Sequence, residues 1–288
     1  MERYYFLFFF ALIWCIFASV NDIKKREIAN WITYSFIIFA LAYRAFYSVV
    51  EKDGGRFFLW GVGGFLIFLI LAHLFYYSRA FAGGDAKLLM GFGVILPFEE
   101  FWDLLFLSAG FIFLLFFIGA IYSLFYSFFL VYKNWSKFNK SFSYYQRKYN
   151  KLLILVLILL LILLIIFLIN GFAISDLVIP TILLFLLTTI FIYLKAVEKS
   201  CLIVLLNPRK LTEGDWLERD IRIKGRVIKK SVHGLSAEEI KILKRYGRNV
   251  WIKQGVPFAP AFLISILIFG ISYLYSIGLN DLYSLISG

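Results

Sequence analysis

The stretch that decides the fold is LLILVLILLLILLIIFLI, from Leu152 to Ile169, in which every side chain is aliphatic or aromatic. A run of this length without a polar group can cross the hydrocarbon core of a bilayer as one helix. Hydrophobic residues make up 62% of the 288 positions and the mean hydropathy is +0.84. Soluble domains are about half apolar, so these values exclude a soluble globular protein. The sequence predicts an integral membrane protein that crosses the bilayer several times.

Eight apolar segments are long enough to be predicted as membrane-spanning helices, because such a helix needs about 20 mostly apolar residues. They lie at 4–21, 31–50, 57–78, 86–107, 105–132, 152–170, 177–197 and 257–277, and the fourth and fifth overlap near Pro97 to Asp103. The predicted fold class is an all-α polytopic membrane protein with about eight transmembrane helices. A small cytoplasmic α+β unit is expected between the last two helices.

The charges in the turns predict the orientation of the chain. Lys and Arg gather after the first, third, fifth and seventh apolar segments, whereas Asp and Glu dominate the opposite turns. Because cytoplasmic turns are enriched in basic residues, both termini are expected outside and the basic turns inside. These turns account for the net charge of +12, so nucleic acid is not an expected partner. Membrane lipid is the expected partner of the basic surface.

The stretch 198–256 is the only sizeable polar part of the sequence. It holds 14 Lys and Arg against 7 Asp and Glu, an excess of seven positive charges (14 − 7). Ser236 and Glu239 have the spacing of a capping box that opens a helix. Because a basic unit of this kind repels a basic peptide, it is expected to lie against anionic lipid.

Two acidic residues lie at the predicted ends of apolar segments, where a carboxylate near hydrocarbon is costly. Asp22 closes the first segment, and Asp85 opens the fourth directly after Gly83 and Gly84. In the predicted topology both carboxylates fall at the cytoplasmic face, so they could meet although 63 positions separate them (85 − 22). Two carboxyl groups that share one proton can activate water for hydrolysis. The glycines are expected to let the backbone bend sharply and to let an extended substrate approach.

The same residues also have plainer interpretations. Asp85 could cap a helix N-terminus, and Asp22 could be an interfacial charge beside Lys24. Lys87 could adjust the pKa of Asp85 or contact substrate, or it could anchor the topology. Asn30 is expected to be the N-cap of the second helix. The spacing of these residues does not decide between a catalytic pair and these alternatives.

Around these residues the sequence resembles the type IV prepilin peptidase family of GxGD-class membrane aspartyl proteases, and in particular its archaeal preflagellin and prepilin peptidases. The family's first aspartate ends a helix and precedes a basic turn and Ile-Pro-Asn, as Asp22 here precedes Ile28-Ala29-Asn30. Its second aspartate follows glycines and precedes Lys-Leu-Leu, which matches Gly83-Gly84-Asp85-Ala86-Lys87-Leu88-Leu89. The stretch Gly255-Val256-Pro257-Phe258-Ala259-Pro260 is similar to the family's proline-containing entry into a late helix.

Two positions depart from the family pattern. Ala82 stands where the strict Gly-x-Gly-Asp string has its first glycine, and Ala29 stands where proline is usual. The resemblance is strong over 1–130 and suggestive over 198–265, whereas 133–197 has no counterpart and could be an insertion. The cysteine-rich insert of the bacterial enzymes is missing, which favours the archaeal, peptidase-only branch.

The resemblance implies a membrane aspartyl endopeptidase that removes the basic leader from archaellin or type IV pilin-like precursors. Asp22 and Asp85 would form its catalytic dyad, supported by the loop residues Gly83, Gly84 and Lys87. The family implies no metal and no organic cofactor, and the oligomeric state is not predicted. The alternatives are a presenilin or signal-peptide-peptidase type of protease, a transporter that uses the two aspartates as a proton or cation relay, and a purely structural membrane subunit. The first is disfavoured because its aspartates lie late in the chain, and the second because no internal repeat is visible.

The predicted organisation has four segments. Residues 1–132 form a catalytic membrane core that carries both aspartates, and 133–197 form a basic cytoplasmic loop with two further transmembrane helices. Residues 198–256 form the small basic cytoplasmic unit. Residues 257–288 form the last transmembrane helix and the C-terminal tail.

Overall fold

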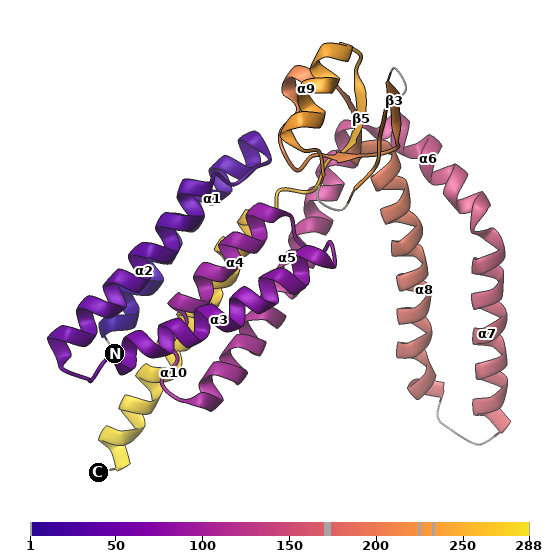
Figure 1. The fold of residues 1–288 in the computed structure, drawn as a ribbon. Helices are drawn as coiled ribbons and strands as arrows, with labels where there is room; N and C mark the ends of the chain where they lie inside the picture. The colour runs from indigo at the N-terminus through magenta and orange to yellow at the C-terminus, as the bar shows by residue number, and fades with distance from the viewer. Residues whose placement is uncertain (1, 170–173, 224–225, 232–233, 288) are drawn as a thin grey trace. The chain divides into compact units, whose positions relative to one another are not determined.

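The structure is a computed structural model, and it describes residues 2–169, 174–223, 226–231 and 234–287 (Figure 1). The chain divides into two compact units. The first unit, which we call the membrane unit, consists of residues 1–125 and 255–288. The second unit consists of residues 126–254.

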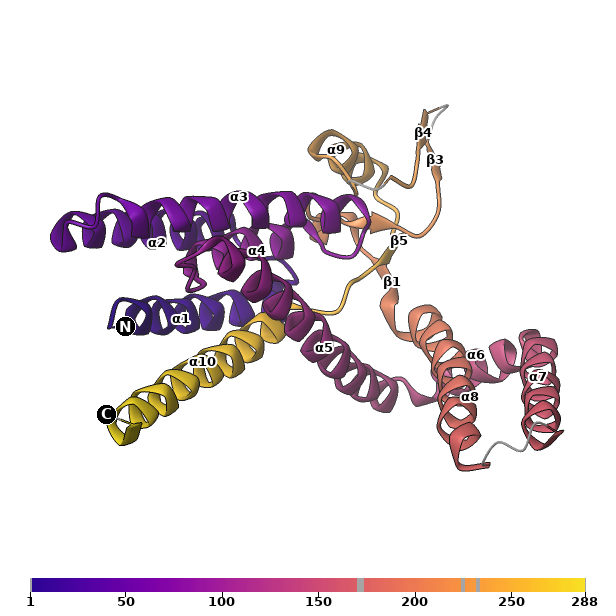
Figure 2. The same cartoon turned by 90° about the horizontal axis from the view of Figure 1, so that it is seen from below.

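The membrane unit is a bundle of helices whose bounds follow the apolar segments of the sequence. They are α1 (Glu2–Lys25), α2 (Asn30–Glu51), α3 (Arg56–Tyr77), α4 (Gly83–Ile95), α5 (Phe101–Lys133) and α10 (Ala259–Ser287), and the last turns of α5, from Tyr126 on, belong to the second unit. Successive helices run in opposite directions because short turns join them, and α4 packs against both α2 and α3 (Figure 2). Helix α10 returns from far along the sequence to pack against α1.

Large aromatic side chains fill the centre of this bundle. Phe36, Phe68, Phe92, Phe111 and Phe262 are all fully buried. The Phe92 ring stacks on Phe262 with centroids 5.4 Å apart and also contacts Phe36 and Phe111. Aromatic rings bury a large apolar area with few rotatable bonds, so they stabilise the bundle and hold α4 among its neighbours.

Helices α3 and α4 approach each other closely because each carries a glycine at the crossing point. A Cβ atom added at Gly64 would lie 2.0 Å from the carbonyl oxygen of Gly93, and one added at Gly93 would lie 2.3 Å from that of Gly64. No side chain fits there, and small residues at such crossings are typical of membrane helix packing. The position of α4 is therefore fixed against α3.

The number of membrane spans differs from the sequence prediction. Among the described residues, five helices are long and apolar enough to cross a membrane, or up to six if a bent pair counts as one span. All eight predicted segments are helical in large part, but α4 has 13 residues and is about 20 Å long at 1.5 Å per residue, shorter than the hydrocarbon core. The predicted helix over 86–107 is wrong, because α4 ends at Ile95 and α5 begins at Phe101. The chain is a polytopic membrane protein, but eight spans are not confirmed.

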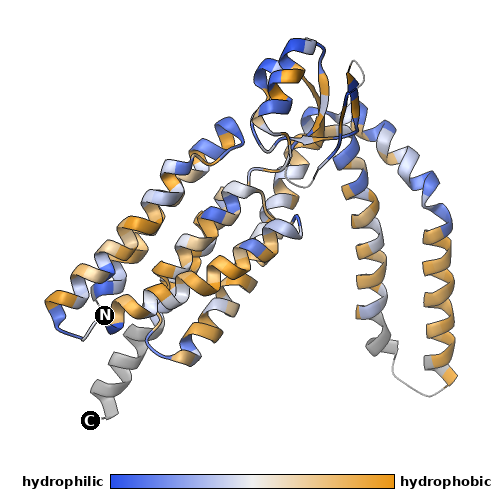
Figure 3. Ribbon diagram, viewed as in Figure 1, coloured by the Kyte–Doolittle hydropathy of each residue, from blue (hydrophilic) through white to orange (hydrophobic). Residues whose placement is uncertain are grey.

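The second unit begins with three helices, α6 (Trp135–Lys148), α7 (Asn150–Ile169) and α8 (Ile174–Val197). Helix α7 is hydrophobic from Leu152 onward, after Asn150 and Lys151 at its start (Figure 3). Helix α6, which the sequence analysis treated as a basic loop, is amphipathic and meets α7 at an angle of 56°. Its Phe138 is buried against Val131 and Ala196, so the apolar face of α6 is used for packing.

A small sheet domain completes the second unit. Its elements are β1 (Ile203–Leu206), β2 (Trp216–Leu217), β3 (Ile221–Ile223), β4 (Arg226–Ile228), α9 (Ala237–Tyr246) and β5 (Val250–Lys253). Strand β5 lies between β1 and β2 and is antiparallel to both, while β3 and β4 form a separate antiparallel pair. The predicted capping box is confirmed, because Ser236 accepts from the N–H of Glu239 and the Glu239 carboxylate accepts from the N–H of Ser236. Leu243 and Ile252 lie in the fully buried core of this domain.

Candidate active site

Asp22 lies in the last turn of α1 and is buried, with 6% of its surface exposed. Its Oδ2 accepts a hydrogen bond of 2.9 Å from the backbone N–H of Ala259, the first residue of α10, and its carboxyl group also accepts from the N–H of Phe258. The first N–H groups of a helix have no partner within the helix and carry partial positive charge. The start of α10 therefore binds and orients the Asp22 carboxylate.

Asp85 is the third residue of α4 and is half-buried. It lies in the first turn of α4, whose N-cap is Ala82, so an acidic side chain stands at this helix N-terminus, as the capping interpretation expects. Helix α1 contacts α4, and Asp22 is close enough for its charge to act on Asp85. The structure thus brings together the two carboxyl groups that the sequence analysis singled out. Asp22 is bound by the start of α10 and Asp85 stands in the first turn of α4, and both positions are compatible with a capping role and with a catalytic role.

The sharp bend expected at the two glycines before Asp85 is absent. Gly83 and Gly84 are the first residues of α4, and neither has the positive φ that a sharp glycine turn would require. A Cβ atom added at Gly84 would lie 3.1 Å from the Cβ of Ile28. The absence of a side chain at Gly84 therefore lets the start of α4 pack closely on the turn that follows α1.

Lys87 is bound to α2 rather than to the carboxyl pair. Its Nζ donates a hydrogen bond of 2.8 Å to Oδ1 of Asn30 and lies 5.7 Å from the centre of the Tyr34 ring. The prediction that Asn30 caps α2 is wrong, because Ala29 is the N-cap and Asn30 is the first helical residue. Asn30 and Lys87 instead form a link between the starts of α2 and α4.

The turn after α1 is also linked to the entry of α10. Arg26 has a φ of +56°, which is unusual for a residue with a side chain. Its Nη1 donates a hydrogen bond of 2.6 Å to the carbonyl oxygen of Gly255. The Phe258 ring packs on Phe81, with centroids 5.4 Å apart. The predicted similarity of 255–260 to a late-helix entry thus concerns a segment that directly contacts Asp22 and the loop before α4.

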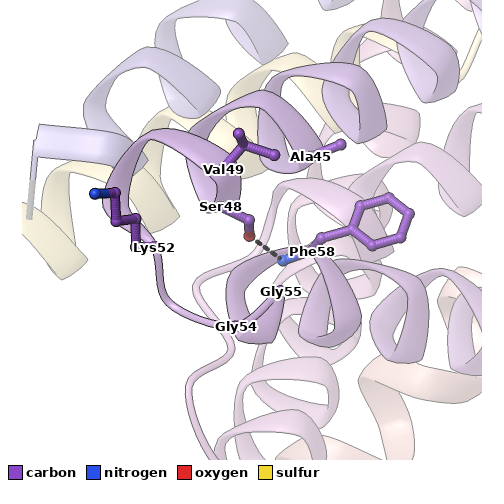
Figure 4. A pocket seen from close by; sticks show the side chains of 7 residues that line it. All are labelled: Ala45, Ser48, Val49, Lys52, Gly54, Gly55 and Phe58. Carbon is purple, nitrogen blue, oxygen red and sulfur yellow. Dashed lines mark hydrogen bonds between the residues drawn. The ribbon is translucent and has the colours of Figure 1, made fainter.

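A separate pocket lies at the other end of α2 and α3 (Figure 4). Its volume is about 480 Å³, and it is lined by Ala45, Ser48, Val49, Lys52, Gly54, Gly55 and Phe58. The Ser48 hydroxyl accepts a hydrogen bond from the N–H of Phe58 inside it. Because the lining is mostly apolar and holds neither aspartate, this pocket is not the candidate active site.

Fold and site together define a polytopic membrane protein with two aspartates held at the same end of a helical unit. The model of the type IV leader peptidase family matches residues 9–131, which include both aspartates. The resemblance stated from the sequence motifs is therefore confirmed for this part of the chain.

Several curated proteins are similar to this chain. The preflagellin peptidase of Methanocaldococcus jannaschii is 32% identical over 90 residues, which are 31% of this chain and 38% of that protein. The preflagellin peptidase of Methanococcus maripaludis is 33% identical over 82 residues, 28% of this chain and 35% of that one. The prepilin peptidase EppA of Methanothermobacter thermautotrophicus is 30% identical over 214 residues, 68% of this chain and 55% of that one.

The aligned part of the chain thus spans between 35% and 55% of the length of these three relatives. No solved structure matches the chain.

Two groups that hold the helices of the membrane unit in place, one at each of its ends, were not predicted from the sequence. The first is the N–H of Ala259, which could not be assigned to Asp22 because a backbone group carries no sequence signal and lies 237 positions away. The second is Arg44, a charged residue in the middle of the apolar segment 31–50. An ionisable residue inside a predicted span is a signal in itself, and it could have been noticed.

Proposed function

We propose that this protein is a membrane aspartyl endopeptidase that removes the basic leader peptide from archaellin or type IV pilin-like precursors. The observation that carries this proposal is the approach of Asp22 and Asp85 within a segment that matches the type IV leader peptidase family. The names of the aligned relatives, preflagellin peptidase and prepilin peptidase, support the choice of substrate.

In the proposed mechanism the two carboxyl groups share one proton and act as a unit. The ionised group takes a proton from water, whose oxygen then attacks the scissile carbonyl carbon, while the protonated group donates to the carbonyl oxygen. When the tetrahedral intermediate collapses, the C–N bond breaks and a proton passes to the leaving amine. The products are a free leader carboxylate and the mature N-terminus. The N–H groups at the start of α10 hold Asp22 in place for these steps.

The proposed topology places this site at the cytoplasmic face, with both termini outside and eight spans. Basic residues at the end of the membrane unit that holds the aspartates, Lys24, Lys25, Arg26 and Arg79, support this orientation. The opposite end carries Glu51, Asp53, Glu99 and Glu100. For α4 to count as one of the eight spans, it would have to cross a bilayer that is locally thinned, or be completed by the turn after it.

In this proposal residues 1–132 form the catalytic core. Residues 257–288 form the helix that supports it. Residues 133–197 supply a basic loop and two further spans. The sheet domain within 198–256 would lie on anionic lipid rather than bind the leader, because its excess positive charge repels a basic peptide.

The experiment is a cleavage assay with the purified protein in detergent and an archaellin or prepilin-type precursor. We expect Asp22→Asn and Asp85→Asn each to lower cleavage by roughly 10³-fold or more, because a single carboxyl group cannot act as both acid and base. Glu27→Gln is the matched control, since Glu27 is an exposed carboxylate in the turn after α1. It should cleave at the wild-type rate.

Three outcomes would contradict the proposal in different ways. Near-normal cleavage by either Asp variant would remove that aspartate from the mechanism. Absence of any cleavage by the folded wild-type protein, together with proton- or cation-coupled uptake in vesicles, would favour the transporter. Cleavage in the middle of a membrane segment instead of at its cytoplasmic boundary would favour the signal-peptide-peptidase type.

A further inference from the structure

Arg44 is a fully buried cation in the middle of α2, with 0% of its surface exposed. Its guanidinium donates hydrogen bonds to three backbone carbonyl oxygens, from Nε to Val94 at 2.6 Å, from Nη2 to Leu96 at 2.7 Å and from Nη1 to Phe57 at 2.8 Å. A guanidinium has five N–H donors in a rigid planar arrangement, so one side chain can bind several carbonyl groups at once.

Two of these carbonyl groups belong to the end of α4. Val94 is in its last turn and Leu96 is its C-cap. The last carbonyl groups of a helix have no partner within the helix and carry partial negative charge, which a cation stabilises. Inside a membrane protein little water is available to bind them, so leaving them unpaired is costly. Arg44 therefore completes the end of α4.

The surroundings keep the Arg44 side chain in one position. Its guanidinium carbon lies 4.3 Å from the centre of the Phe57 ring and 5.6 Å from that of Tyr4. A Cβ atom added at Gly61 would lie 2.4 Å from Cδ of Arg44, so the glycine leaves the space that the side chain occupies. The guanidinium is thus enclosed by aromatic rings and by α3, which limits its motion.

We propose that Arg44 is a positioning residue for Asp85. Helix α4 is a short rigid rod with Asp85 in its first turn and the Arg44 carbonyl contacts at its other end, nine residues and about 14 Å away. By holding the end of α4, Arg44 fixes how far the helix extends along its axis, and this sets where the Asp85 carboxyl lies relative to Asp22. The inference rests on the proposed function, because the position of Asp85 matters for rate only if the two carboxyl groups act together.

The first test measures cleavage kinetics per folded molecule, with the folded fraction taken from size-exclusion chromatography. We expect Arg44→Gln to lower kcat by roughly 10- to 100-fold while KM changes less than about threefold, because a misplacement of about 1 Å impairs the chemical step. Arg44→Lys keeps the charge but not the planar fork, and we expect an intermediate kcat. Arg56→Gln, the matched control on an exposed arginine, should leave both constants unchanged.

The second test measures the position of α4 by disulfide cross-linking, which does not depend on cleavage activity. Cysteines at Ile28→Cys and Gly84→Cys, in a background of Cys15→Ala and Cys201→Ser, bring together two positions whose Cβ atoms are about 3.1 Å apart. This is slightly shorter than the roughly 3.5 to 4.5 Å between the Cβ atoms of a disulfide, so only a small outward movement is needed to form the bond. We expect mild oxidation to join them readily, and Arg44→Gln to slow the reaction at least about fivefold. Gly61→Ala, which displaces the Arg44 side chain without removing its charge, should slow it in the same direction and serves if Arg44→Gln does not fold.

The two tests separate the failure of this inference from the failure of the proposed function. An unchanged cross-linking rate in Arg44→Gln and Gly61→Ala, or a kcat per folded molecule equal to that of the wild type, would overturn the positioning role. A wild-type protein that cleaves no precursor would overturn the proposed function. The cross-linking result would then still decide whether Arg44 holds α4.

Discussion

At each end of the membrane unit, a buried ionisable side chain binds the end of a helix, and the two side chains are of opposite charge type. At one end a buried acidic residue, Asp22, accepts a hydrogen bond from the N–H of Ala259 at the start of α10. At the other end a buried cation, Arg44, donates to carbonyl groups at the end of α4. In each case a charge that would be costly in a membrane is matched to the helix end of opposite partial charge.

The two ends differ in what surrounds the charge. Arg44 is fully buried and binds three carbonyl groups, so its hydrogen-bonding capacity is used within the fold. Asp22 lies beside a second carboxyl group, that of Asp85, which is half-buried. A like charge beside a buried carboxylate does not stabilise the fold. The hydrogen bonds of Arg44 thus serve stability and, in our proposal, position, whereas the aspartate end is where the proposed function places the chemistry.

The largest effect expected from this comparison is on cysteine labelling. A reagent outside the cell should reach a cysteine at one end of the membrane unit and not a cysteine at the other. Single cysteines at Ser78→Cys, near the aspartates, and Glu51→Cys, at the opposite end, replace exposed residues. With Cys15→Ala and Cys201→Ser as background, a membrane-impermeant thiol reagent added to intact cells should label Glu51→Cys and leave Ser78→Cys unlabelled. Labelling of Ser78→Cys from outside would reverse the proposed orientation of the two ends.

The next largest effect concerns one glycine at each end. Gly93→Ala places a methyl group 2.3 Å from a backbone oxygen, which cannot move aside, so we expect a loss of at least about 3 kcal/mol of stability and little folded protein. Gly84→Ala places a methyl group 3.1 Å from Cβ of Ile28, so the turn after α1 has to move by only a few tenths of an ångström. That variant should fold normally but cleave precursor more slowly, because the start of α4 moves relative to Asp22.

Both variants are measured by thermal unfolding in detergent and by cleavage per folded molecule. Gly63→Ala is the control, since nothing lies within 4 Å of the added Cβ atom. If Gly93→Ala unfolds at the wild-type temperature, the glycine contact between α3 and α4 does not hold α4. If Gly84→Ala lowers the unfolding temperature but not the rate of cleavage, the aspartate end contributes to stability rather than to the proposed chemistry.

The sequence predicted the aspartate end better than the opposite end, and the reason is physical. Hydropathy predicted most helices, because a helix that crosses a bilayer is a long apolar run. The two aspartates could be recognised because they are charged residues at the ends of such runs. The end of α4 was misplaced because the apolar composition continues into 96–107. The chain leaves the helix at Leu96, just before Pro97, where Arg44 binds buried carbonyl groups at the helix end. Hydropathy carries no information about such a contact between distant residues.

Contacts between backbone groups and distant side chains were also beyond the sequence analysis. The role of Asn30 was mistaken because an asparagine before an apolar run usually caps a helix, whereas here its side chain accepts from Lys87, 57 positions away. In the second unit, β1 and β5 pair across about fifty residues, and neither short strand has a strong local pattern. By contrast, the capping box of Ser236 is local in sequence, and it was predicted correctly.

A smaller effect is expected from breaking the link between Asn30 and Lys87 at the aspartate end. A hydrogen bond of this kind contributes about 0.5 to 1.5 kcal/mol, which corresponds to roughly a 2- to 10-fold change in rate if it positions α4. We expect Asn30→Ala and Lys87→Met each to lower kcat within that range, and the double variant to be no worse than the worse single variant. Fully additive effects would show that Lys87 acts on substrate independently of Asn30.

The smallest effect is expected at the opposite end, in the turn between α2 and α3. The Asp53 carboxylate accepts hydrogen bonds from the N–H groups of Gly55 at 2.9 Å and Phe57 at 3.0 Å. Desolvation is the largest single influence on this carboxyl group and acts in the other direction, but these bonds and the Ser48 hydroxyl together outweigh it and hold the pKa of Asp53 below its usual value. A carboxyl group with a lowered pKa stabilises the folded state at pH values above its unfolded pKa of about 3.9, and this contribution is lost as the pH falls through the folded pKa.

Asp53→Asn keeps one acceptor but cannot ionise, so it isolates this contribution from that of the other carboxyl groups. We expect the unfolding temperature of the wild-type protein in detergent to exceed that of Asp53→Asn slightly at pH 6 to 7, by the equivalent of less than about 1 kcal/mol. The difference should shrink as the pH is lowered below about 4 and should vanish near pH 2. Precursor cleavage at neutral pH should be the same for both proteins, because Asp53 lies at the end without the aspartate pair. A difference in stability that grows on acidification would mean that the Asp53 carboxylate does not stabilise this turn, and a loss of cleavage would mean that the two ends are coupled more tightly than their contacts indicate.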